Sequence, residues 1–503
     1  MRTETYDLAV IGGGLGAVQA ARAACEQGKR VLLCEATDWI GGQMTSQAVP
    51  PDEHRWIREQ GAPKSYLAYR RAVQEAYLRM PEASDLMRET DDLNPGNGWV
   101  SLLCHDPRIG LAILRASLRP YEDCGRLKVM LTTRCVEAET AGNRVLSVTL
   151  EKKGGERIRV QAAFFLDGTD TGELLPLTGT EYCVGAESRD VFQEPHAPTT
   201  GDREDQQPIT WVAALKWDAQ RQPMEKPAGY ETYARASFRG EPLLGWKSWG
   251  SRGLMRFSML GDDPEDSTPG LWSYRRIQYP PYFSDGRSEV VLLNWPQNDY
   301  VFGNIIDTQR AEENCEQARE LTRCCAYWLW EQGYPVSFCP DMLGTEDGLA
   351  KAPYVRESRR IVSLRQIREQ EIARAYAKEP PTFHDSIGVG HYSLDLHMTT
   401  RTHFTLFEEA WPFEIPLGAM IPVRMENLLP AAKNIGATHL TGGCFRLHPV
   451  EWTIGEAAGM LASFCLDRGI RPRDVEGAYL TDFQRMLTAN GAQLHWKMHD
   501  TNM

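Results

Sequence analysis

The sequence has no Cys-x-x-Cys pair and no long apolar run, and we expect no leader segment before its first strand. Its 12 cysteines are spread over 503 residues, which is typical of buried thiols in a reducing compartment rather than of a disulfide framework or a metal site. No apolar run reaches bilayer length, and Met1–Tyr6 is polar and leads straight into an apolar strand pattern. We therefore expect a cytoplasmic protein with no membrane association and no bound metal.

Clustered positive charge is also missing. The formal net charge is -13, and the basic residues are interleaved with acidic ones, which argues against a nucleic-acid partner. Repeats and low-complexity tracts are absent, while 42% apolar and 24% charged residues are typical of a globular protein. A chain of this length exceeds one compact domain, so we expect two closely joined domains.

The first forty residues read as strand, helix, strand. Asp7–Ile11 and Arg30–Cys34 are apolar runs, and Leu15–Gln27 between them is alanine-rich with helical character. The turn after the first strand has the sequence Gly12-Gly13-Gly14-Leu15-Gly16-Ala17, which fits the pattern GxGxx(G/A).

Each small residue of this turn has a physical use. Gly12 permits the tight turn, Gly14 lets the backbone approach a pyrophosphate, and Ala17 permits close packing of the helix on the strand. Glu35 follows the second strand, where a carboxylate can hold ribose hydroxyls. The motif predicts a bound dinucleotide without separating FAD from NAD, and a glycine-rich turn with no ligand is the alternative.

The rest of the chain shows a change of pattern and then a return. Residues 128–167 contain short β-rich runs broken at 141–143 and 154–155, which favours a β-meander with separate strands at 157–160 and 164–167. Further helices are predicted at 64–79, 107–121, 308–332 and 453–468, and one late strand at 428–432. The last helix is predicted to open with a capping box of Thr453 and Glu456.

Three further stretches carry a resemblance to a known family. They are Glu35 with Trp39–Thr45, Phe164–Gly172, and Asn427–Gly436, the last followed by Arg446–Pro449 and Gly455–Gly459. They resemble the E-x(n)-GG, DATG(D) and NL(L)xAG elements of FAD-dependent oxidoreductases of the glutathione reductase structural class, in the two-dinucleotide-binding-domain flavoprotein branch without a separate NAD(P)H domain. Pro353–Arg360 and Asn294–Tyr300 are similar to one subgroup.

The sequence departs from the family pattern at three places. Ala17 stands for the third glycine and Gly168 for the usual alanine, and Ala432-Lys433 replaces an Ala-Gly pair. The first two changes are conservative in size, whereas the third weakens the resemblance around Lys433.

The resemblance implies an α/β fold with a discontinuous Rossmann-type FAD-binding domain, a β-meander and an inserted α+β substrate or cap domain. We place the two parts of the FAD-binding domain at 1–190 and 418–503, and the substrate or cap domain at 191–417. The residues that the turn motif and the resemblance together assign to FAD are Gly12, Gly14, Gly16, Ala17, Glu35, Ala36, Gly41, Gly42, Gln43, Thr45, Val136, Asp167, Gly168, Thr169, Asn434, Gly436 and Gly455.

Three of the four candidate catalytic residues lie at the loop that precedes the late helix. Histidine is the natural acid or base near a flavin because its ordinary pKa is close to neutral. His439 and His448 lie beside the loop that the resemblance places next to the flavin, Arg446 is a candidate for holding a substrate anion, and His397 belongs to a second polar cluster. For any single histidine, a structural or surface role is the commoner one.

The leading functional hypothesis is removal of hydride from a C–H bond next to nitrogen or oxygen in a small organic substrate. Oxygen or another acceptor, which the sequence does not identify, would reoxidise the flavin. The sequence also leaves open whether the protein forms a homodimer. A second GxGxxG is absent, which favours a dehydrogenase or oxidase over a disulfide reductase. The alternatives are a monooxygenase or halogenase that uses reduced flavin from a partner, for which Trp411–Pro416 gives weak support, and a non-catalytic flavin-binding protein.

Overall fold

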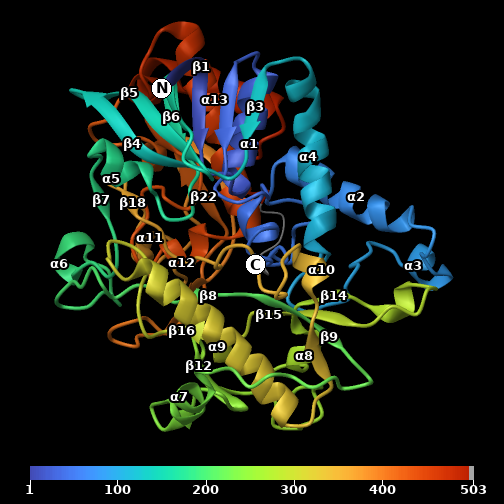
Figure 1. Cartoon of the computed structure of the whole chain (residues 1–503). Coiled ribbons are helices and arrows are strands. Elements are labelled where there is room, and N and C mark those ends of the chain that lie inside the picture. Colours follow the sequence, from blue (N-terminus) through green and yellow to red (C-terminus); the bar gives the residue numbers. More distant parts are fainter. Residues whose placement is uncertain (498–503) are drawn as a thin grey trace.

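The N-terminal strand–helix–strand unit forms the centre of a mixed seven-stranded sheet. In the computed structural model, which describes residues 1–497, β1 (Arg2–Ile11) lies between β2 (Val31–Cys34) and β6 (Arg157–Asp167) and is parallel to both. β3 (Leu127–Met130) extends the parallel part beside β2. The strands are apolar because helices cover the sheet, as expected for parallel strands (Figure 1).

β6 is one long strand rather than the two short strands predicted at 157–160 and 164–167. It pairs with β1 from Arg2–Ile158 to Ile11–Asp167, and this continuous partner keeps the intervening residues extended. The first half of β6 also pairs antiparallel with β5 (Arg144–Lys152), which pairs with β4 (Thr133–Ala141). The predicted meander is therefore β4, β5 and β6, while β3, also expected in it, belongs to the parallel part.

The last part of the described chain returns to this sheet. β23 (Leu428–Pro430) pairs parallel with the end of β6, and α13 (His448–Arg468) packs against α1 (Leu15–Glu26). In Figure 1 the blue N-terminal and red C-terminal segments accordingly share the upper part of the molecule. Residues 498–503, the end of the predicted C-terminal return, lie outside the described residues.

Small residues set the distance between α1 and α13. A Cβ added at Gly455 would lie 1.9 Å from the backbone oxygen of Gly16, and one at Gly459 would lie 2.2 Å from the oxygen of Ala20. Any side chain at these two positions would push the helices apart. Gly16 and Gly455 thus bring the two ends of the chain together.

α13 begins five residues before the predicted start. Thr453 lies inside the helix, where its hydroxyl donates to the carbonyl of Pro449 at 2.8 Å, so the predicted capping box is wrong. The helix opens at His448 with a proline in its first turn and no capping side chain. Its first turns are fully buried, so tertiary packing rather than a local cap fixes the helix start.

Three other predicted helices are confirmed with small shifts at their ends. They are α2 (Lys64–Leu78), α4 (Pro107–Asp123) and α9 (Ala311–Glu331). The Asp106 carboxylate caps α4 by accepting from the Arg108 amide at 2.8 Å. Gly333, at φ +101°, follows the end of α9.

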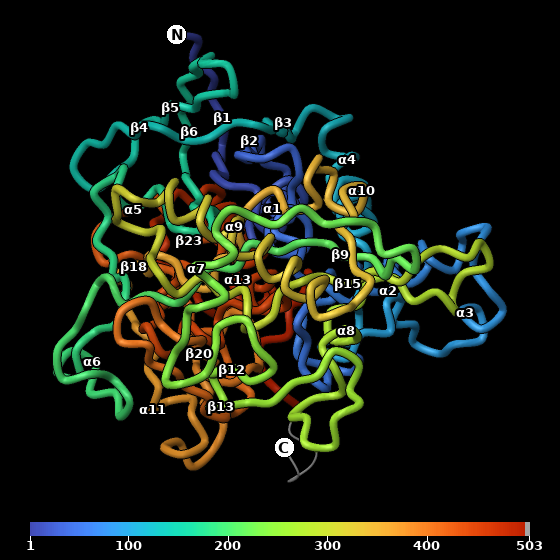
Figure 2. The backbone as a smooth tube through the Cα atoms, turned by 60° about the horizontal axis from the view of Figure 1, so that its bottom comes forward, coloured from blue at the N-terminus to red at the C-terminus, as the bar shows by residue number. Residues whose placement is uncertain are grey.

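A second buried core surrounds α9. It is built on an antiparallel sheet in the order β14 (Arg276–Gln278), β15 (Val290–Leu293), β9 (Ala213–Trp217), β17 (Val336–Phe338). Figure 2 turns this region toward the viewer. Another antiparallel pair, β19 (Ser386–Gly390) and β22 (Phe413–Pro416), packs on α13 and shares the first core. The domain boundaries at 190 and 417 stay predictions.

The remaining helices and strands are short. They are α3 (Asp85–Glu89), α5 (Leu174–Thr178), α6 (Arg189–Phe192), α7 (Tyr230–Arg235), α8 (Leu271–Tyr274), α10 (Pro340–Leu343), α11 (Glu369–Ile372), α12 (Gly442–Phe445), α14 (Pro472–Asp474), α15 (Leu480–Ala489), β7 (Tyr182–Cys183), β8 (Ile209–Thr210), β10 (Ser237–Phe238), β11 (Glu241–Pro242), β12 (Lys247–Gly250), β13 (Gly253–Arg256), β16 (Asp299–Tyr300), β18 (Arg360–Ile361), β20 (Leu394–Leu396) and β21 (Leu406–Glu408).

The two conservative departures from the family pattern face each other. A Cβ added at Gly168, just after β6, would lie 2.4 Å from the Cβ of Ala17 on α1. The space between the end of β6 and α1 holds one methyl group, and in this chain Ala17 on α1 supplies it. The missing side chain at Gly168 therefore leaves room for the methyl group of Ala17.

We expect Gly168→Ala to lower the free energy of unfolding by about 1–3 kcal/mol because it overpacks this contact. Adding Ala17→Gly should recover roughly 1 kcal/mol or more, so the two substitutions should be strongly non-additive. Chemical denaturation of the wild type, the single variants and the double variant measures this coupling.

The matched control is Ala24→Gly, which makes the same change two turns further along α1. Its effect should add to that of Gly168→Ala. Equal coupling for Ala17 and Ala24 would contradict the proposed contact.

Candidate FAD site

A cavity of about 220 Å³ lies at the carboxyl ends of β1, β2 and β6. This edge of a parallel sheet is where α/β folds bind their ligands. Its walls come from five chain segments and from the central region. The lining includes Gly12–Gly14, Glu35–Thr37, Thr133–Cys135, Gly168–Thr171, Ser46, Gln47, Pro353 and Val355.

The glycine turn at Gly12–Gly14 packs directly against the paired glycines Gly41 and Gly42. Gly12 has φ +86° and Gly41 has φ +106°, both in the region that favours glycine. A Cβ added at Gly42 would lie 2.9 Å from the Cα of Gly14. α1 starts at this point without a capping side chain, so the turn has the features of a phosphate-binding helix N-terminus.

Glu35 closes the other side of the turn. Its carboxylate accepts from the Gly13 amide at 2.8 Å and from the Thr37 amide at 2.7 Å. Burial raises the pKa of Glu35 to about 7, although these hydrogen bonds act to lower it. The carboxylate is held beside the cavity, where a ribose hydroxyl can reach it.

Asp167, at the end of β6, is fully buried and organises the chain that follows. Its two oxygens accept from the Thr169 amide and hydroxyl and from the Leu174 amide, at 2.7–3.1 Å. Burial raises its pKa to about 6, against the effect of the Thr169 hydrogen bonds. Asp167 and Thr169 thereby fix the loop 168–171 that lines the cavity.

Beyond the paired glycines, buried polar side chains from both ends of the chain meet. Lys433 donates to Asp170 at 2.7 Å, Gln47 donates to the other oxygen of Asp170 at 2.6 Å, and Gln43 contacts Glu451 in the first turn of α13. Lys433, where the sequence departs from the family pattern, therefore belongs to the site.

Three oxygens in this cluster have no hydrogen-bond partner although they are buried: the Oε1 atoms of Gln43, Gln47 and Glu451. Buried polar atoms normally find partners. Unpartnered oxygens next to a glycine-lined cavity fit a polar cofactor that supplies donors, which FAD does.

Other predicted cofactor residues lie at the edge of the cavity or behind it. Asn434 donates to the Asp167 carbonyl at 3.1 Å, and Thr45 donates to the Ile40 carbonyl at 2.6 Å. Gly436 packs against Ser363, where a Cβ would lie 1.8 Å from its hydroxyl oxygen. Val136 follows Cys135 of the lining, and Ala36 lies in the lining itself. Their direct contact with FAD stays a prediction, as it does for Gly16 and Gly455.

Two of the four predicted catalytic residues are engaged within the protein. His448 is buried, accepts from the Asp52 amide at 3.1 Å, and has its other ring nitrogen 3.2 Å from the Val49 carbonyl. Burial lowers the pKa of His448 to about 4. His439 lies with its Nδ1 3.1 Å from Glu357, which also pairs with Arg360.

His397 and Arg446 lie at one buried polar cluster. Nδ1 of His397 is 2.5 Å from Asp299 Oδ2, and its Nε2 is 3.8 Å from Asp395 Oδ2. Arg446 donates to Asp395 at 3.0 Å and to the Tyr354 hydroxyl at 2.6 Å. Burial acts to raise the pKa of Asp299, but Arg356 and His397 outweigh it and lower this pKa to about 2.

This cluster adjoins the cavity. Pro353 and Val355 line the cavity, whereas Tyr354 between them reaches Arg446, as expected for alternate residues of extended chain. The Arg446 carbonyl in turn accepts from Gln43 at 2.9 Å. Sequence reasoning missed Tyr392, whose hydroxyl donates to Asp395 at 3.2 Å, and the neighbouring pair of Arg275 and Asp52. They come from distant segments and match no motif.

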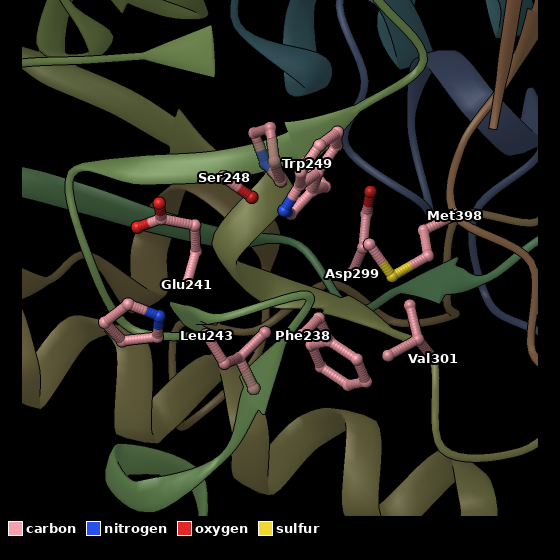
Figure 3. A pocket seen from close by; sticks show the side chains of 10 residues that line it. Phe238, Glu241, Leu243, Ser248, Trp249, Asp299, Val301 and Met398 are labelled. Carbon is pink, nitrogen blue, oxygen red and sulfur yellow. The ribbon is translucent and has the colours of Figure 1, made fainter. Parts of the chain in front are cut away.

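Asp299 also borders a small pocket on the other side of the cluster. Figure 3 shows its side chain with those of Met398 and Trp249, and the pocket measures about 20 Å³. The neighbouring Arg356, like Arg359 and Arg360, makes an ion pair, with Asp299, Asp307 and Glu187 respectively. These three ion pairs connect the segment 356–360 to three other parts of the chain.

The structure gives two further observations about residues 1–497. None of their helices combines the length and apolar character that crossing a bilayer requires. No group of three or more His, Cys, Asp or Glu side chains among them is placed to hold a metal ion.

Comparison with known proteins identifies relatives. The profile of a family described as FAD dependent oxidoreductase matches residues 7–487. An N,N-dimethylglycine/sarcosine dehydrogenase from Chromohalobacter salexigens is 55% identical over 42 residues, which is 8% of this chain and only 6% of that enzyme's length.

Two solved structures align over nearly the whole chain. One is a geranylgeranyl bacteriochlorophyll reductase-like protein from Thermoplasma acidophilum, with 11% identity, a TM-score of 0.35, and coverage of 98% of this chain and 85% of that one. The other is a myxobacterial chondrochloren halogenase, with 14% identity, a TM-score of 0.34, and coverage of 99% and 84%. TM-scores this low add nothing to the argument.

The pKa of Glu35 gives a prediction for the FAD-free protein. Because burial raises this pKa from 4.5 to about 7, the folded state binds the proton more tightly than the unfolded state. The resulting stability is complete below pH 4.5 and is lost as the pH rises to 7. Relative to wild type, Glu35→Gln should gain roughly 3 kcal/mol of unfolding free energy between pH 4 and pH 8.

Denaturant unfolding of both proteins over this pH range measures the difference. Glu75→Gln, at an exposed position on α2, is the matched control and should show no comparable trend. A difference between Glu35→Gln and wild type that stays constant with pH would be incompatible with the raised pKa.

Proposed function

Because the chain belongs to the FAD dependent oxidoreductase family, we propose that this FAD enzyme removes hydride from a C–H bond next to nitrogen or oxygen in a small organic substrate. We also propose that it belongs to the glutathione reductase structural class, with residues 191–417 as its substrate or cap domain. The observation that carries the proposal is the polar cluster of Arg446, Tyr354 and His397 directly behind the FAD cavity.

The protein's part in FAD binding follows from the cavity. Gly12–Gly14 and the start of α1 would hold the pyrophosphate, and Glu35 would hold the ribose. Gln43, Gln47 and Lys433 would face the flavin end, where Lys433 brings a buried positive charge. When bound, FAD supplies the two-electron acceptor for the substrate's hydride.

His397 is the proposed proton acceptor. Its Nδ1 is held by Asp299 at 2.5 Å, and its Nε2 points toward the Asp395–Arg446 pair without a hydrogen bond in this direction. The Asp299 carboxylate thereby fixes the orientation of the imidazole ring. His397 would take the proton from the substrate's amine or hydroxyl as the C–H bond breaks.

The comparisons and motifs favour a dehydrogenase or oxidase. The short match to an N,N-dimethylglycine/sarcosine dehydrogenase is compatible with oxidation next to nitrogen. Within the Trp411–Pro416 segment, which gave weak support for a halogenase, Phe413–Pro416 form the buried strand β22, and Phe413 is fully covered. Oxygen or another small acceptor is the proposed oxidant of the reduced enzyme.

The purified protein should show a flavin spectrum that an amine, alcohol, amino acid or hydroxy acid bleaches in the absence of oxygen. Admitting oxygen or an artificial acceptor should restore the colour. Absorption spectra of the holoenzyme with a panel of these compounds test this expectation. Halide-dependent turnover with a partner reductase would instead point to a halogenase, and no bleaching by any compound would support a non-catalytic flavoprotein.

With a substrate from this panel, His397→Asn should slow flavin reduction by about 10²–10⁴-fold at neutral pH. The FAD content should not change, because His397 does not line the FAD cavity. Stopped-flow absorption measures the rate. The control is His384→Asn, an exposed histidine, and equal rates in the two variants would remove His397 from the mechanism.

A further inference from the structure

Arg275 is a buried arginine whose hydrogen-bonding capacity is largely unused. It directly precedes β14 and is 6% exposed. Its Nε and Nη1 make no hydrogen bond, and its Nη2 reaches only the Tyr274 hydroxyl at a long 3.4 Å. The nearest carboxylate is Asp52, with Oδ1 3.5 Å from Nη1.

This differs from the hydrogen-bonded arginines nearby. Arg356, for example, donates to the Pro208 carbonyl, to Thr210 and to Asp299 at 2.8–2.9 Å. A buried charged donor without hydrogen-bond partners costs more free energy than a neutral one. The free edge of Arg275 therefore suits a ligand that supplies acceptors.

Arg275 and Arg446 face the same group of side chains. Burial acts to lower the pKa of both guanidinium groups, while Asp52, Tyr354 and Tyr392 act to raise both. Nε of Arg446 is also buried without a partner. The Tyr354 hydroxyl accepts from Arg446, which leaves its own proton to donate.

A planar anion matches these donors. A guanidinium edge binds the two oxygens of a carboxylate with parallel N–H bonds, and Arg is favoured over Lys for such contacts. The position also fits, because Asp52 contacts His448, the first residue of α13, and Arg446 contacts Gln43 beside the cavity. A carboxylate held here would place the rest of a small molecule near the flavin end.

We propose that Arg275, together with Arg446 and Tyr354, binds the carboxylate of the substrate, so that the enzyme acts on organic acids or amino acids rather than on neutral amines or alcohols. This inference rests on the proposed function of the same site. It assigns to Arg275 a substrate contact that no sequence motif indicates.

The test titrates the holoenzyme with acetate and benzoate, and with acetamide and benzamide as uncharged matches. Carboxylates should perturb the flavin spectrum saturably, and the amides should bind at least tenfold more weakly. Arg275→Met should weaken carboxylate binding by about 10–100-fold, and Arg275→Lys should weaken it less. Arg276→Met is the control, because Arg276 is fully engaged with Glu289 and two backbone carbonyls.

Loss of Arg275 alone leaves Asp52 without its counter-charge, so Arg275→Met with Asp52→Asn is measured as well. This double variant removes both charges and should retain the fold and the FAD content. Equal binding of acids and amides, or unchanged carboxylate affinity in both Arg275→Met proteins, would overturn the subsite.

Failure of the subsite and failure of the proposed function give different results. If neutral amines or alcohols bleach the flavin and carboxylates do not bind, the reaction class stands and the subsite is wrong. If carboxylates bind through Arg275 but no compound bleaches the flavin, the subsite stands and the reaction class is wrong.

Discussion

The close crossing of α1 and α13 is the constraint on which the rest of the site depends. Backbone meets backbone at Gly16 and Gly455, and again at Ala20 and Gly459. This contact fixes the first turn of α13 against the glycine turn of α1. Through it, Glu451 and His448 from late in the chain reach positions beside the paired glycines and the loop at Asp52.

The site is layered outward from that crossing. Glycines and the ends of three parallel strands form the cavity, and a cluster of buried polar side chains from both ends of the chain lies beside it. The extended segment 353–355 lies between the cavity and the polar cluster of Arg446 and His397, and it contacts both. One segment can therefore position a cofactor on one side and a substrate on the other.

Local sequence predicted the elements whose stability is local. The strand–helix–strand unit, α2, the capped start of α4 and the glycine-terminated α9 follow from periodicity and from capping residues close in sequence. Predictions failed where a distant partner decides the outcome. β6 is continuous because β1 pairs along its whole length, and α13 starts at His448 because its first turns are buried by other segments.

The sequence by itself determined the dinucleotide turn, the acidic residue at the end of β2 and the family resemblance, because these depend on residue types at short, fixed spacing. Only the tertiary structure decided that Gly168 offsets Ala17, that Lys433 pairs with Asp170 of the cavity lining, and that Arg275 is buried with unused donors next to Asp52. These are contacts between segments far apart in the chain. Such contacts depend on how helices and sheets pack, and no local pattern encodes them.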